Sequence, residues 1–202
     1  MKIVGVHTLV SRGNYAQSKH WAATRAQIRA AIRSCTWPPG SDRFTIYPQS
    51  GKKRGQGNGV GPIKKGFVDE LKKRGWAIEA PAKNLLGQAL GDFDAVLPGP
   101  EKPIVAEWET GNISSSHRSM NKLTMLVADN VISAGTLVVP SRKLYVFLTD
   151  RIGNIQELEP YFRLWRSVPC KKGVLQILVV EHDAESYGVR RIPKLTAGRA
   201  RG

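Results

Sequence analysis

Three carboxylates, Asp94, Glu107 and Glu109, have the residue types and the spacing of a site for a hard metal ion. Glu107 and Glu109 follow the apolar run 104–106 with one residue between them, so on a strand both side chains point to the same face. Two like charges side by side repel, and a buried carboxylate is costly unless a cation compensates it. A hairpin through 98–100 would bring Asp94 beside Glu107 and complete an oxygen site suited to a divalent cation.

The chemistry that fits such a site is hydrolysis of a phosphodiester. It needs a nucleophilic water and a stabilised leaving oxygen, which two metal ions about 4 Å apart can supply. We expect Mg²⁺, two ions per site, bound by Asp94, Glu107 and the backbone carbonyl of Trp108. Glu109 stands where many nucleases of the PD-(D/E)xK type carry lysine, and it could bind metal or accept a proton from the attacking water. The alternative is that Glu109 is a solvent-exposed strand residue and that Asp92 or Asp94 forms a turn.

The charge of the chain favours a polyanionic partner. The 202 residues include 31 Lys and Arg against 16 Asp and Glu, a net charge of +15. No segment approaches the ~18 consecutive apolar residues that a membrane span requires, and no signal peptide is visible. Without an apolar span, we expect no membrane association. Cys35 and Cys170 are too few for a disulfide framework, so we expect a protein of the reducing cytoplasm. The length suggests a single domain, 1–202, with a basic tail from about 184.

Other chemistries find little support. His7, His20, His117 and His182 are scattered without zinc spacing, and no phosphate-binding loop of the GxxxxGK[ST] type is present. The basic run 52–54 in the glycine-rich segment 50–61 is either a contact to a phosphate backbone or a mobile surface loop. The arginines of the first expected helix, at 25, 29 and 33, either face DNA or are simply solvated.

Apolar periodicity predicts the elements that position the carboxylates. Strands are expected at 2–10 (an edge strand), 44–47, 76–79, 91–97, 104–106, 136–139, 144–148 and 174–180, and helices at 17–34, 62–74, 114–134 and 155–166. Strands mixed with helices predict an α/β fold with helices on both sides of a central sheet.

The segment 107–123, EWETGNISSSHRSMNKL, resembles the catalytic segment of the BamHI-type type II restriction endonucleases. Similarity continues at 35–38, 44–46, 58–64, 148–151 and 157–162 and covers roughly 35–195. The resemblance implies a restriction-endonuclease-like mixed sheet flanked by helices. It also implies a homodimer on double-stranded DNA, with 114–134 in part of its interface, and a methyltransferase that protects the host.

The active site of the family carries over position by position. Asp94 and Glu107 match its metal-binding residues, and Glu109 matches the glutamate taken as the general base. Glu79 matches a further glutamate that completes the site, although by itself it would be read as a surface residue at a strand end.

The base-reading residues of the family are also present, at Asn112, Ser114 and Arg118 and at the pair Asp150 and Arg151. Arg and Asp suit a G·C pair, although adjacent Asp and Arg alone would suggest a surface ion pair. The implied target is the palindrome GGATCC, cut after the first G. The chain departs from the pattern at its C-terminus, where the family's last helix is reduced to a basic tail.

A non-catalytic, sequence-specific DNA-binding protein on a decayed nuclease fold is the rival reading. The intact set Asp94, Glu107 and Glu109 argues against decay.

Overall fold

A mixed six-stranded sheet forms the centre of the computed structural model, which describes residues 1–53, 55–149 and 152–194. The predicted pair Asp150 and Arg151 lies outside the described residues. The strand order is β1-β7-β6-β5-β4-β3. The strands are β1 (Lys2–Arg12), β3 (Ala77–Lys83), β4 (Ala89–Leu97), β5 (Ile104–Trp108), β6 (Ala134–Pro140) and β7 (Gly173–Glu181). The short strands β2 (Thr45–Ile46) and β8 (Ala184–Glu185) pair separately.

The middle of the sheet is parallel and its two sides are antiparallel. β6 pairs in parallel with β5 and β7, whereas β1 pairs antiparallel with β7, and β4 pairs antiparallel with both β3 and β5. Every residue of β5 and β6 is buried, as expected for strands covered on both faces. The expectation of an edge strand near the N-terminus is confirmed, because β1 lies at one end of the sheet.

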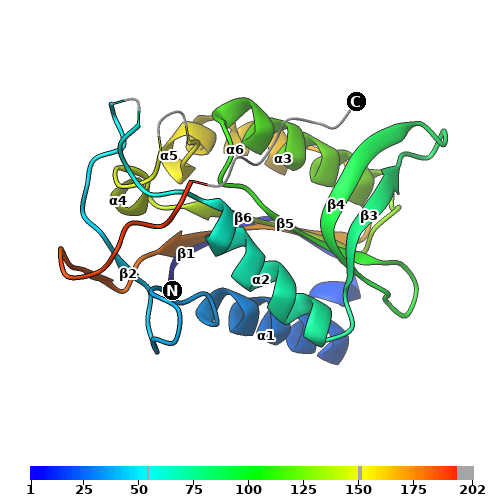
Figure 1. Cartoon of the computed structure of the whole chain (residues 1–202). Coiled ribbons are helices and arrows are strands. Elements are labelled where there is room, and N and C mark those ends of the chain that lie inside the picture. The colour runs from blue at the N-terminus through cyan, green and yellow to red at the C-terminus, as the bar shows by residue number, and fades with distance from the viewer. Residues whose placement is uncertain (54, 150–151, 195–202) are drawn as a thin grey trace.

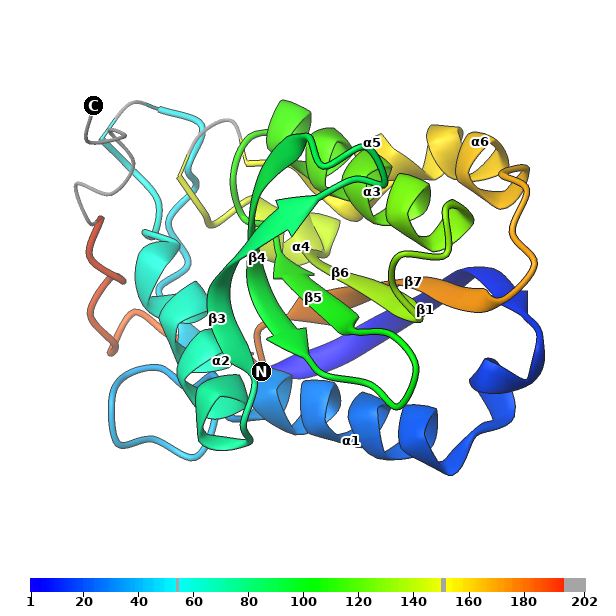
Figure 2. The ribbon, with the colours of Figure 1, turned by 90° about the vertical axis from the view of Figure 1, so that its right-hand side faces the viewer.

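Helices cover both faces of the sheet (Figure 1). α1 (Lys19–Arg33) and α2 (Gly61–Lys73) lie on one side, and α3 (Ile113–Ala128), α5 (Ile155–Leu158) and α6 (Phe162–Arg166) lie on the other. Two apolar clusters correspond to these two faces. Figure 2 shows the β3–β4 hairpin rising from the sheet toward the α3 side. The predicted α/β architecture with helices on both sides is therefore confirmed.

Three predicted elements were wrong in kind or extent. The segment 144–148 is not a strand. Ser141 Oγ accepts a hydrogen bond from Leu144 N (3.1 Å) and starts the short helix α4 (Arg142–Tyr145). The helix predicted at 114–134 ends at Ala128, because Asn130 adopts a left-handed backbone (φ 57°) and turns the chain toward β6. The helix predicted at 155–166 is divided by a 3₁₀ turn, Glu159–Tyr161, which contains a proline.

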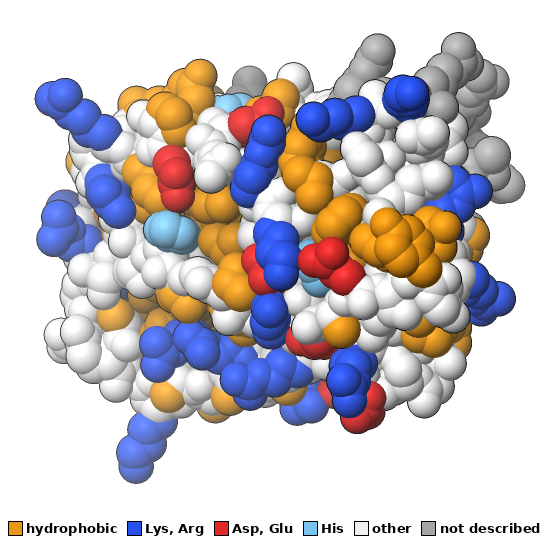
Figure 3. All heavy atoms as spheres, turned by 90° about the vertical axis from the view of Figure 1, so that its left-hand side faces the viewer, with side chains coloured by type: hydrophobic (Ala, Val, Ile, Leu, Met, Phe, Trp, Pro, Cys, Tyr) orange, Lys and Arg blue, Asp and Glu red, His pale blue; other side chains and the backbone are white. Residues whose placement is uncertain are grey.

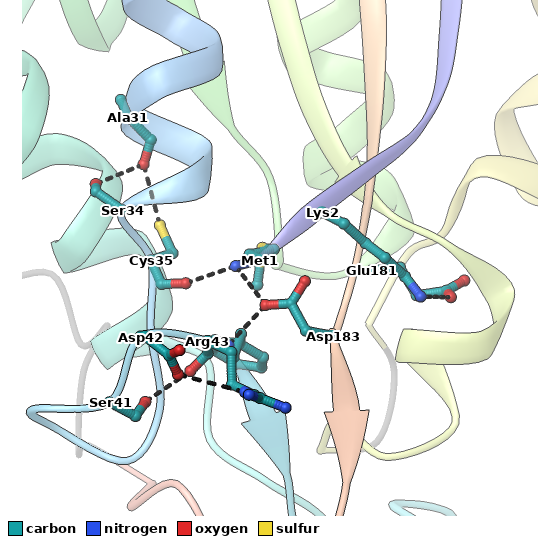
Figure 4. Close-up of polar contacts among 11 residues, drawn as sticks. Met1, Lys2, Ala31, Ser34, Cys35, Ser41, Asp42, Arg43, Glu181 and Asp183 are labelled. Carbon is teal, nitrogen blue, oxygen red and sulfur yellow. Dashed lines mark hydrogen bonds and ion pairs between the residues drawn. The ribbon is translucent and has the colours of Figure 1, made fainter.

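The amino terminus is held in the fold by an ion pair between its buried ammonium and the partly exposed carboxylate of Asp183 (Figure 4). The α-ammonium of Met1 lies 2.9 Å from Asp183 Oδ2 and donates to the carbonyl of Cys35 (2.9 Å). Asp183 Oδ2 also accepts from Phe44 N (2.7 Å). These contacts join the start of β1 to the end of α1 and to the segment between β7 and β8.

Lys and Arg side chains are more prominent than Asp and Glu on the face shown in Figure 3, where a few acidic side chains lie near the centre. Two of the acidic residues of the chain pair with lysines, Glu181 with Lys2 (3.2 Å) and Glu185 with Lys143 (3.6 Å). Among the described residues, no helix has the length and apolar character needed to cross a membrane.

Candidate active site

A cavity of about 920 Å³ opens between the β4–β5 hairpin, the start of α2 and the start of α3. Five of the residues predicted from the sequence line it: Asp94, Glu107, Trp108, Glu109 and Arg118. The strand ends that carry the carboxylates therefore open into one space.

Asp94 and Glu107 are neighbours across two strands, as the predicted hairpin requires. Ala95 pairs with Ala106 in the β4–β5 register, which sets Asp94 beside Glu107. Asp94 N donates to Glu107 Oε2 (3.2 Å), and Trp108 N donates to Asp94 Oδ2 (2.7 Å). Each carboxylate is thus fixed by the backbone of the other's strand.

Two lysines that were not predicted from the sequence compensate these carboxylates. Lys64 Nζ, from α2, lies 2.6 Å from Asp94 Oδ1. Lys122 Nζ, from α3, lies 2.5 Å from Glu107 Oε1 and donates to the carbonyl of Asp92 (2.8 Å). The Lys122 side chain is only 10% exposed. The signal that could have found it is helical spacing, because Lys122 lies four residues after Arg118 and so shares its face of α3.

Glu109 lies just past the end of β5, and both oxygens of its carboxylate accept hydrogen bonds. Its Oε1 accepts from Gly111 N (2.7 Å) and its Oε2 from Ser119 Oγ (3.3 Å). The predicted alternative of a solvent-exposed strand residue is wrong, because Glu109 is half-buried in the cavity wall.

Burial makes the site electrostatically costly. Desolvation raises the pKa of Glu107, while Lys122 opposes that shift and Asp94 adds to it. Desolvation likewise raises the pKa of Glu109, against the hydrogen bond from Gly111 N, and Asp94 again adds to the rise. The pKa values of Glu107 and Glu109 are thus raised although Lys64 and Lys122 lie nearby, and a further cation beside these carboxylates would favour their charged forms.

The carboxylate oxygens of the site are of the kind that a hard divalent cation prefers, but they are not arranged around a common point as metal ligands. Asp94 and Glu107 supply adjacent carboxylate oxygens, which Mg²⁺ prefers. Among the described residues, however, no group of three or more Asp, Glu, His or Cys side chains is arranged to hold a metal ion. The positions beside the two carboxylates are taken by the ammonium groups of Lys64 and Lys122.

Glu79 stands apart from the other three acids. The pairs Ile78–Ala95 and Ala80–Phe93 leave it opposite Asp94 in the β3–β4 register, but its side chain is exposed and does not line the cavity. Its backbone is left-handed (φ 51°), which is rare for a residue other than glycine and tends to occur at functional sites.

The predicted base-reading residues begin α3. Asn112 caps the helix, because its Oδ1 accepts from Ser115 N (3.0 Å). Ser114 and Arg118 are exposed on the first turns, and Arg118 lines the cavity. The first turns of α3 therefore lie beside the carboxylates, at the mouth of the same cavity.

Comparisons with known proteins identify the family of the chain. The family model described as "Restriction endonuclease BamHI" matches residues 1–199. The type II restriction enzyme OkrAI of Oceanobacter kriegii is 42% identical over 200 residues, 99% of each chain. The type II restriction enzyme BamHI of Bacillus amyloliquefaciens is 33% identical over 184 residues, which cover 87% of this chain and 81% of that one.

The chain belongs to the BamHI restriction endonuclease family. The predicted resemblance is confirmed, and membership makes the chain a type II, site-specific deoxyribonuclease. A crystal structure of the restriction endonuclease BglII complexed with a DNA 16-mer superposes with a TM-score of 0.64. The alignment covers 91% of this chain and 79% of that one. At 11% identity, this likeness supports the restriction-endonuclease fold alone.

Proposed function

We propose that this member of the BamHI family cleaves double-stranded DNA at GGATCC, after the first G, in a reaction that depends on Mg²⁺. The observation that carries the proposal is the Asp94–Glu107 pair, fixed by backbone hydrogen bonds at the edge of a cavity that Lys64 and Lys122 also line. A decayed nuclease would have no reason to maintain buried, mutually repelling carboxylates at the cost of stability.

Asp94 and Glu107 would bind Mg²⁺, two ions per site, with the carbonyl of Trp108 as a further ligand. A metal held by these residues would supply Lewis-acid chemistry to the attacking water and to the phosphoryl oxygens. Glu109 would hold the attacking water and take its proton, which a carboxylate with a raised pKa does more readily. Glu79 would approach Asp94 from the neighbouring strand, where its left-handed backbone lets the side chain turn.

The start of α3 would enter the major groove. Arg118 is the strongest candidate for a base contact, since arginine pairs in bidentate fashion with guanine O6 and N7. Asn112, Ser114 and the pair Asp150 and Arg151 complete the proposed reading set.

A homodimer follows from the symmetry of the proposed target, because cutting both strands of a palindrome calls for two sites related by a two-fold axis. A host methyltransferase that protects the same sequence would be its functional partner.

The test is cleavage of a plasmid carrying one GGATCC by wild type and by Glu107→Gln, with Mg²⁺ and with EDTA. Wild type should linearise the plasmid with Mg²⁺ and not with EDTA. Glu107→Gln should leave the plasmid intact under both conditions and should keep the circular dichroism spectrum of wild type. Specific binding by wild type without cleavage under all conditions would favour the decayed-nuclease alternative.

A further inference from the structure

Asn58 is a buried side chain at which three distant segments of the chain meet. It is 0% exposed. Its Nδ2 donates to the carbonyls of Tyr47 and Phe147 (2.8 Å each), and its Oδ1 accepts from Ile192 N (3.1 Å). Its backbone N–H donates to Phe147 O (2.8 Å), and its carbonyl accepts from Thr149 N (2.9 Å). The side-chain amide thus gives Ile192 N its acceptor and adds a second hydrogen bond to the carbonyls of Tyr47 and Phe147, which also accept from Gln49 N and Asn58 N.

Glycines around Asn58 allow these segments to approach closely. A Cβ at Gly51 would lie 1.5 Å from the carbonyl oxygen of Leu148, and one at Gly59 would lie 2.1 Å from that of Pro193. Gly59 N donates to Ile192 O (2.9 Å). Side chains at these positions would force the segments apart, so the junction depends on backbone-to-backbone contact.

This junction forms one wall of the cleavage cavity. Gly59, Thr149 and Lys194, one from each of the three segments, line the same space as Glu107 and Glu109. Lys194 also lines a second hollow of about 350 Å³, together with Arg191. The basic end of the described chain is therefore held beside the catalytic carboxylates rather than projecting from the fold.

We propose that Asn58 is a positioning residue that fixes the segment 192–194 in the cavity wall, so that the ammonium of Lys194 contacts a phosphate of the bound DNA. This inference rests on the proposed function, since it requires DNA in the cavity. Ile192 is 1% exposed, so its side chain anchors the segment in the core. Lys194 is exposed, and its Nζ donates to Gln56 O (2.5 Å). Loss of Asn58 frees the Ile192 amide and releases Lys194 from the wall.

A double-mutant cycle tests the link between Asn58 and Lys194. The measurement is the affinity for a GGATCC duplex by fluorescence anisotropy in Ca²⁺, at several salt concentrations. Lys194→Ala should weaken binding roughly three- to tenfold and reduce the salt slope by about one, as expected for one lost phosphate contact. Asn58→Ala should do the same, and the double variant should bind no more weakly than Asn58→Ala alone.

Thr136→Val is the matched control. Thr136 is also 0% exposed and accepts a hydrogen bond from Gln176 (2.9 Å) in the sheet, away from the cavity. This variant should lose stability without changing the salt slope. If Asn58→Ala fails to fold, Gly59→Ala replaces it, because its Cβ would displace Pro193 while leaving the Tyr47 and Phe147 contacts of Asn58 in place.

Additive effects of Asn58→Ala and Lys194→Ala, or a salt slope unchanged by either, would overturn the inference. Cleavage of GGATCC by wild type in the same preparation keeps the two claims separate. If wild type neither binds nor cuts this duplex, the proposed function is refuted. If wild type cuts the duplex but the effects of the two substitutions are additive, only the role of Asn58 is refuted.

Discussion

Lys122 and Lys64 change how the acidic residues of this chain are understood. The sequence shows acids whose repulsion calls for a cation, and the fold supplies two ammonium groups before any metal binds. The pairing with Lys122 opposes the effect of burial on Glu107, although desolvation still raises the pKa of that carboxyl. Sequence spacing found the acids because they lie near each other in the chain, and it missed the lysines because α2 and α3 bring them from elsewhere.

Replacement of Glu109 by Gln should abolish cleavage with Mg²⁺ and tighten metal-free binding to GGATCC several-fold. The amide can keep the hydrogen bonds with Gly111 N and Ser119 Oγ, while a negative charge that would face the DNA phosphate is removed. The measurement is a mobility shift in EDTA, wild type against variant on one duplex. Equal or weaker binding by the variant would mean that Glu109 does not face the phosphate.

Arg118→Ala should lose discrimination rather than general affinity. A bidentate contact to guanine contributes about 1–3 kcal/mol against the wrong base pair, so binding to GGATCC should weaken toward the level of random DNA. Arg25→Ala, an exposed arginine on the opposite face of the sheet, serves as the control and should leave discrimination unchanged. If cognate and random duplexes lose affinity equally, Arg118 touches only the backbone.

At the scale of elements, the local sequence pattern predicted the hairpin that carries the acidic residues, but it predicted some of the neighbouring elements wrongly. The β4–β5 hairpin was predictable because turn residues join two apolar runs, and its register fixes Asp94 beside Glu107. The run 144–148 has strand-forming residues, yet the cap at Ser141 and tertiary packing make its first part helical. The position of Glu79 came from resemblance alone, because no sequence pattern reveals its left-handed backbone.

Asp183→Asn tests the contact that holds the first strand. Burial alone would raise the pKa of Asp183, but the Met1 ammonium and Phe44 N hold it below its ordinary value. A folded-state pKa below the unfolded one adds stability at neutral pH that is lost as the pH falls through the acid range. The variant should therefore unfold about 1–3 kcal/mol more easily at pH 7.

The difference between wild type and Asp183→Asn should shrink in urea titrations below about pH 4, where the unfolded carboxyl also takes up its proton. Asp42→Asn, at an 84%-exposed carboxylate, is the control and should change stability little. A difference that stays constant from pH 7 to pH 3 would show that the ion pair does not stabilise β1.

At the scale of the whole molecule, the exposed apolar side chains of the segment 161–164 point to the proposed dimer. Tyr161 is 47% exposed and Leu164 is 59% exposed, and both neighbour Trp165, which is bound to α3 through Asn121 (2.9 Å). A two-fold contact there would bury them with α3.

Leu164→Asp should convert the proposed dimer to a monomer in sedimentation experiments. Leu86→Asp is the matched control, since Leu86 is 82% exposed in the turn between β3 and β4 and lies outside the segment 161–164. A dimer that survives Leu164→Asp would place the interface elsewhere.

The most direct test of the central claim is to map the ends produced from one plasmid that carries a single GGATCC, with Mg²⁺ present. The account predicts cleavage after the first G on both strands, loss of cleavage when one base pair of the site is changed, and none with Glu107→Gln. Ends at scattered positions, or cleavage that persists in Glu107→Gln, would contradict it.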